Sequence, residues 1–138
     1  MIVKFHSAGG HSFKGLTNYL TEDMSRVDFI ETRNLITNNP HTAARVMAAT
    51  AMNQAELKKQ AGIKNTGRKG GGAVVHFTLS WKDEEAENRD LDQDGIARAV
   101  DTVLRHIGAD KKQRSQYGDE HQILMVSHND KKYAHVHV

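Results

Sequence analysis

One segment of the chain alternates between apolar and polar side chains more strictly than any other, and it constrains the fold most. It comprises residues 74–81. Because successive side chains of a strand point to opposite faces, strict alternation is typical of a β-strand with one face in the core. The core side chains of this strand are expected to be Val75, Phe77, Leu79 and Trp81. The other face would carry Val74, His76, Thr78 and Ser80.

Shorter apolar runs predict strands at residues 2–5, 122–127 and 134–138, with Asn129-Asp130 as the turn of a hairpin between the last two. Residues 27–36 are ambiguous between a short strand and an irregular connection. Helical spacing predicts three helices, which start after Ser12, after Asn39, and after Asp92 or Asp94. The middle helix would continue to about Gln60, before Gly62 as its C-terminal cap, and the last one would stop at Gly108. The side of the middle helix that faces the core is predicted to contain Ala44, Met47, Ala48, Ala51 and Ala55.

This order of elements favours an α+β fold in which a largely antiparallel central sheet of about five strands packs with helices. A chain of 138 residues suits one domain, spanning 1–138. Because it stops on Val138 within an apolar alternating segment, we expect a fragment truncated at its C-terminal end. The lack of any apolar run of ~20 residues argues against a membrane span. A net charge of +2 is too small to indicate a nucleic-acid partner by itself.

The most informative chemistry lies in the last eleven residues, which contain three histidines and an aspartate. His135 and His137 share one face of a strand, and the hairpin can bring His128 opposite them, at the ~5 Å of cross-strand neighbours. Three imidazoles could then meet at one metal ion with a coordination position left open, as in catalytic sites. Asp130 could accept a ring N–H from one ligand. The alternative is an exposed polar face, which the presence of His128 and Asp130 disfavours.

The spacing His-x-Asp-x-x-x-x-His-x-His, from His128 to His137, resembles the third motif of the relaxases, the plasmid mobilization nucleases of the histidine-hydrophobe-histidine superfamily. Asn18-Tyr19-Leu20 is similar to their first motif, which carries the nucleophilic tyrosine. Residues 76–81 are similar to a central strand of the class that includes the Agrobacterium T-DNA relaxase and broad-host-range plasmid relaxases. The family pattern usually continues to an asparagine beyond the last histidine, where this chain has already ended.

The resemblance implies an enzyme that nicks one DNA strand at a plasmid origin of transfer and stays joined to it through a 5′-phosphotyrosine on Tyr19. The three histidines would hold magnesium or manganese. His76 would bind the scissile phosphate or help deprotonate the tyrosine, unless it is an ordinary structural histidine. Tyr19 has an alternative as well, since it could be a core aromatic on the face of Leu16 and Leu20. Tyr117 and Tyr133 are poorer nucleophile candidates.

Basic residues would track single-stranded DNA, although such clusters are often only solvated surface. They are Lys64, Arg68, Lys69, Lys131 and Lys132. By resemblance, the protein would act as a monomer in the bacterial cytoplasm, within a relaxosome with accessory proteins. It would then pass with its strand through a type IV secretion channel, by way of the coupling protein, into the recipient cell.

Two kinds of alternative stay open. A rolling-circle replication initiator or single-strand transposase would share the chemistry, but those enzymes usually place the tyrosine after the histidine motif, whereas Tyr19 precedes it. A non-catalytic DNA-binding module with an incidental metal site would lack the covalent step. The remaining histidines receive no role: His6, His11, His41, His106 and His121.

Overall fold

The computed structural model describes residues 1–6, 12–65, 73–82, 91–107, 121–130 and 134–138, and it confirms an α+β fold with an antiparallel sheet. The strands are β1 (Ile2–Phe5), β2 (Val27–Arg33), β3 (Phe77–Ser80), β4 (Ile123–His128) and β5 (His135–His137). The helices are α1 (Phe13–Thr21), α2 (Pro40–Met52), α3 (Gln54–Gln60) and α5 (Gln93–His106), with a 3₁₀ turn at Met24–Arg26. Residues 27–33 of the ambiguous segment 27–36 therefore form a strand.

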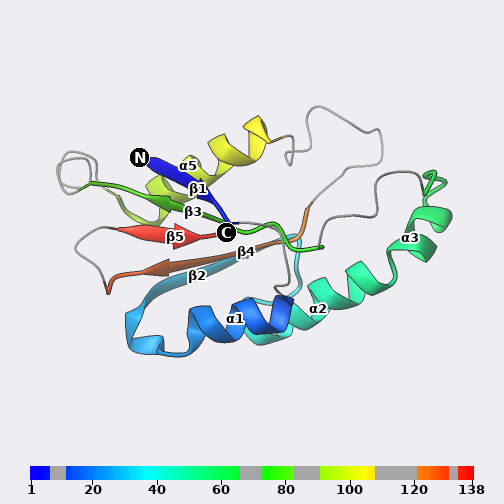
Figure 1. Cartoon of the computed structure of the whole chain (residues 1–138), viewed down its shortest axis with the longest axis horizontal. Helices are drawn as coiled ribbons and strands as arrows, with labels where there is room; N and C mark the ends of the chain where they lie inside the picture. Colours follow the sequence, from blue (N-terminus) through cyan, green and yellow to red (C-terminus); the bar gives the residue numbers. More distant parts are fainter. Residues whose placement is uncertain (7–11, 66–72, 83–90, 108–120, 131–133) are drawn as a thin grey trace.

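The sheet has the order β1-β3-β5-β4-β2, and every neighbouring pair is antiparallel. The last strand in sequence, β5, thus lies in the middle of the sheet (Figure 1). Thr78 of β3 stands opposite His137, and His128 of β4 stands opposite His135. Directly paired residues project their side chains to the same face. The sheet order therefore brings residues from three strands together on one face.

The opposite face of the sheet carries the main hydrophobic core. Leu79 and Val136, both fully buried, pack there with Ile96 and Val100 of α5. Burying side chains of this size contributes about 1.5–3 kcal/mol each. Phe77, Leu79 and Trp81 are buried as predicted, but Val75 is 63% exposed, because the strand begins only at Phe77.

Helices α1 and α2 pack on each other and cover the other side of the sheet, next to β2 and β4 (Figure 1). Side-chain oxygens of Ser12, Asn39 and Asp92 accept hydrogen bonds from backbone N–H groups in the first turns of α1, α2 and α5, so the predicted caps are confirmed. Among the described helices, none has the length and apolar character needed to cross a bilayer.

The predicted helix from residue 39 to residue 60 is divided into α2 and α3 at Asn53, whose side chain donates to the carbonyl of Ala49. An asparagine side chain that bonds the backbone of the preceding turn competes with helix continuation. Only the start of α2 is fully buried, and Ala55, which was predicted to face the core, is exposed. Gly62, with φ of 68°, follows α3 in the left-handed conformation expected of a C-terminal cap. The predicted stop at Gly108 lies outside the described residues.

Candidate metal centre

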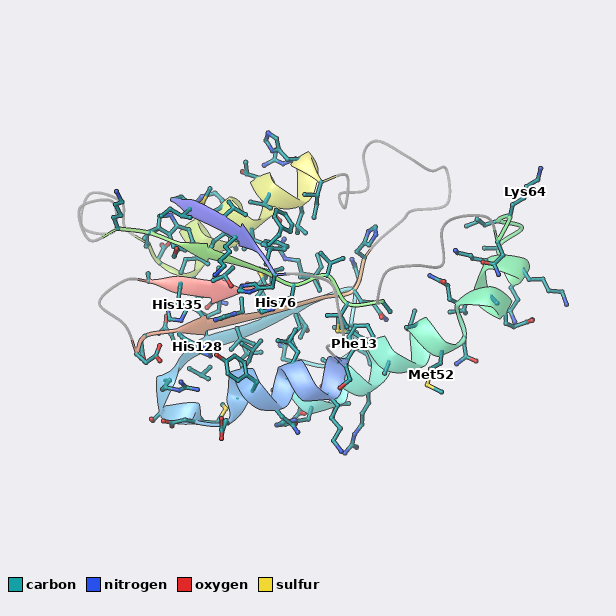
Figure 2. The ribbon with its side chains drawn as sticks, viewed as in Figure 1. Phe13, Met52, Lys64, His76, His128 and His135 are labelled. Carbon is teal, nitrogen blue, oxygen red and sulfur yellow. The ribbon has the colours of Figure 1, made fainter. Side chains whose placement is uncertain are left out.

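Three histidines of β4 and β5 converge on the sheet face that also carries α1. One ring nitrogen from each of His128, His135 and His137 lies within 4.8 Å of the other two. Their ring centroids are 5.1–5.5 Å apart. Figure 2 shows His128 and His135 on neighbouring strands at the same end of the sheet. We call these three residues the triad. Side chains of β5 alternate between the two faces, so His135 and His137 share one face, and the pairing with β4 places His128 opposite His135.

His128 is held by the backbone of α1. Its Nε2 donates to the carbonyl oxygen of Leu20 at 2.8 Å, and the residue is 5% exposed. A carbonyl can only accept, so in the neutral ring Nδ1 is the nitrogen with the free lone pair. A backbone carbonyl bonded to the far nitrogen is the usual way in which proteins orient a metal-binding histidine.

His137 is held by side chains instead. Its Nδ1 lies 3.0 Å from Nε2 of His76 and 3.3 Å from the hydroxyl of Thr78. Burial, and next the surrounding histidines, lower the pKa of His137 to about 3. The ring is therefore neutral over the physiological range, which is the protonation state that a metal ligand requires.

His76 and His6 extend the triad into a row of five rings. His76 is 8% exposed, and the ring of His6 stacks on it with centroids 4.2 Å apart. His6 Nε2 also lies 2.7 Å from the Thr78 hydroxyl. Sequence reasoning gave His6 no role, because no local pattern connects residue 6 with residue 76. The hydrogen bond from the His6 amide to the carbonyl of His76 makes that connection.

Asp130 lies at the edge of the triad. Its Oδ1 is 3.6 Å from Nε2 of His135, a distance longer than a hydrogen bond, and its Oδ2 accepts from Nη1 of Arg26 at 3.4 Å. The carbonyl of Arg26 also accepts from the Asn129 amide, which ties the start of β2 to the end of β4. Arg26 was not singled out from the sequence, since its position beside Asp130 depends on the pairing of β2 with β4.

Tyr19 lies on α1 and is 63% exposed, so it is not the core aromatic considered as an alternative. The buried residues of this helix are Thr17, Leu20 and Thr21. Tyr19 directly precedes Leu20, whose carbonyl binds His128. The backbone of the tyrosine is therefore next to the residue that contacts the triad, while its side chain is open to solvent.

The predicted DNA-binding lysines and arginine fall mostly outside the described residues: Arg68, Lys69, Lys131 and Lys132. Lys64 is described and exposed. Figure 2 shows it beyond the end of α3, well away from the labelled histidines. The described structure therefore does not bring Lys64 to the triad.

The donor set of the triad suits a divalent cation. Three imidazoles supply nitrogen ligands without adding negative charge, and the far nitrogens of His128 and His137 already have partners that fix the rings. Such a set is compatible with several divalent ions, so the rings do not identify the metal.

The chain was also compared with known proteins. Residues 19–138 match the family model described as relaxase, MobA/VirD2-like, nuclease domain. The match starts at Tyr19 and includes the whole triad. No curated protein and no solved structure showed a significant match.

Proposed function

Since that match spans all but the first 18 of its 138 residues, the chain belongs to the MobA/VirD2-like relaxase family, and we propose that it nicks one DNA strand at an origin of transfer with Tyr19 as nucleophile. The family supports a mobilization nuclease in general terms. The convergence of three imidazoles beside α1, two of them oriented by hydrogen bonds, supports the finer proposal that the reaction depends on a metal.

The triad would hold the divalent ion, magnesium or manganese by the family resemblance. When bound, the ion supplies positive charge to a non-bridging oxygen of the scissile phosphate and stabilises the charge of the transition state. Because the three ligands are neutral, they leave the charge of the ion undiminished for the phosphate. The burial of His128 and His135, and the side-chain contacts of the half-buried His137, keep the rings in place before DNA arrives.

Tyr19 would carry out the covalent step. Its Oη–P bond forms as the bond from phosphorus to the 3′ oxygen breaks, which leaves a 5′-phosphotyrosine and a 3′-hydroxyl. The phenol loses its proton to a base, and the departing oxygen takes one up. Tyr19 is 63% exposed, which suits a nucleophile that must reach a polymeric substrate. A side chain this exposed contributes little to core packing.

His76 and Asp130 would act around the triad. The Nε2 of His76 faces His137, which favours a role through that ligand over direct contact with the phosphate. Asp130 would orient His135 and balance charge together with Arg26, because its carboxylate lies between the two. Both are positioning residues in this proposal.

Single-stranded DNA would approach along basic side chains, among them Lys64, Arg68, Lys69, Lys131 and Lys132. Binding through such contacts weakens as salt rises. In the cell, the chain would act in the cytoplasm with relaxosome accessory proteins. A type IV coupling protein would then deliver it, joined to its strand, into the recipient. These partners follow from the family resemblance and are proposals for this chain.

A covalent-adduct assay tests the proposal. The protein is incubated with manganese and a tiled set of labelled single-stranded oligonucleotides from the DNA around its gene, and the products are separated on a denaturing gel. We expect one oligonucleotide to yield a protein-linked band that disappears in Tyr19→Phe and on chelation. An adduct that persists in Tyr19→Phe would assign the nucleophile elsewhere.

Tyr117→Phe and Tyr133→Phe are the matched controls, since each removes one phenol hydroxyl at another position of the same chain. Both should retain the adduct. DNA binding without any adduct in the wild-type protein would favour a non-catalytic DNA-binding module.

A further inference from the structure

Behind His137, on the side away from the rest of the triad, the structure places a hydroxyl between two imidazoles. The Thr78 hydroxyl lies 3.3 Å from Nδ1 of His137 and 2.7 Å from Nε2 of His6. Thr78 stands directly opposite His137 in the pairing of β3 with β5. The contact between the two side chains is therefore built into the register of the sheet.

The chemistry of these groups gives the protons a consistent order. His137 has Nδ1 turned toward Thr78 and His76, so Nε2 is the nitrogen left to bind a cation. A ligand nitrogen must present its lone pair, so the proton of the neutral ring sits on Nδ1. The Thr78 oxygen and Nε2 of His76 can share that N–H as its acceptors, and Thr78 can donate its own hydrogen to His6 Nε2. A hydroxyl can accept and donate at once.

His6 also restricts the ring beside this hydroxyl. Its imidazole stacks on His76 with an interplanar angle of 15°, and the His6 amide donates to the carbonyl of His76. His76 in turn lies 3.0 Å from the same Nδ1 of His137. Residue 6 therefore supports His137 by two routes, through Thr78 and through His76.

We propose that Thr78 and His6 are positioning residues of the metal centre, which fix the tautomer and ring orientation of His137 so that its Nε2 faces the cation. The inference rests on the proposed metal-binding function of the triad. It assigns a role to two residues outside that triad. It also gives a reason for polar contacts among side chains that are half or fully buried. Removing such an outer partner of a metal-binding histidine typically weakens metal affinity 10–100-fold.

The decisive variant is Thr78→Val, which removes the hydroxyl and keeps the β-branched shape of the side chain. We expect Mn²⁺ affinity, measured by titration calorimetry, to fall about 10–100-fold, with a changed Mn²⁺ electron paramagnetic resonance spectrum. Thr78→Ser restores a hydroxyl and should bind Mn²⁺ nearly as the wild type does. Thr50→Val is the matched control, because the exposed Thr50 hydroxyl donates to the carbonyl of Val46 within α2.

His6 provides a second, independent variant pair. His6→Leu removes the acceptor for the Thr78 hydroxyl, and His6→Gln returns a carbonyl oxygen near the position of Nε2. We expect the leucine variant to lose Mn²⁺ affinity and the glutamine variant to recover most of it. Urea unfolding without metal identifies any variant whose fold has changed.

The outcomes separate the two proposals. A wild-type protein that binds no Mn²⁺ would overturn the metal-dependent function and, with it, this inference. A wild-type protein that binds Mn²⁺, with Thr78→Val and His6→Leu binding equally well, would overturn only the positioning role. Equal loss in Thr78→Ser and Thr78→Val would also overturn it, because the hydroxyl would then not be the group that matters.

Discussion

Two neighbouring residues of β5 show how differently the two faces of the sheet are built. Val136 is fully buried among apolar side chains beneath α5. His137 points the other way and meets ring nitrogens and a hydroxyl. On the apolar face, side chains must only be apolar and of a size that packs closely. On the polar face, each hydrogen-bond donor must lie opposite a particular acceptor. Substitutions on the apolar face should therefore mainly change the free energy of unfolding. Substitutions on the polar face should mainly change metal binding and nicking.

The largest expected effect is on the polar face. His135→Ala removes one of three metal ligands, and the loss of about 4 kcal/mol of transition-state stabilisation would slow nicking ~1,000-fold. Rates of adduct formation at saturating Mn²⁺ measure this. The control is His106→Ala, whose exposed ring lies 2.7 Å from the carbonyl of Thr102 in its own helix. Nicking by His135→Ala within tenfold of wild type would contradict the metal role of the triad.

The apolar face should respond in stability instead. Leu79→Ala creates a cavity at a fully buried position and should lower the free energy of unfolding by about 2–5 kcal/mol. The folded fraction of the Leu79→Ala variant should keep the Mn²⁺ affinity of the wild type. Urea unfolding and calorimetry check the two readouts separately.

Leu57→Ala makes the same chemical change on α3, where the leucine is 43% exposed, and should cost less than about 1 kcal/mol. If Leu79→Ala weakened metal binding as much as it weakened the fold, the two faces would not be independent.

A further effect is expected from pH on the stability of the metal-free protein. Unfolded His137 takes up a proton near its ordinary pKa of 6.5, whereas burial holds the folded pKa near 3. Between these values the unfolded state binds more protons, so stability rises with pH from about 3 to 6.5 and is lost on acidification. Urea midpoints across this range measure the slope, which should be shallower in His137→Gln. An unchanged slope in that variant would assign the acid sensitivity to other groups.

Much of the fold was predictable because its signals are local. The caps at Ser12, Asn39 and Asp92 and the alternation of residues 77–81 each depend on a few neighbouring residues, and the structure confirms them. The errors also have local causes. A single asparagine side chain divides the long helix at residue 53, and Val75 precedes the strand whose alternation it continues. Tyr19 is exposed because the buried side of α1 is formed by Thr17, Leu20 and Thr21 instead.

The sequence by itself determined that His135 and His137 share a face, because the period of a strand is two residues, and that a hairpin can add His128. Only the tertiary structure decided that β5 lies between β3 and β4, with β1 beyond β3. That order places His6 and Thr78 behind His137, and it brings Arg26 to Asp130 across 104 positions of sequence. Pairing between distant strands depends on how whole faces bury their apolar side chains, and no local period records it.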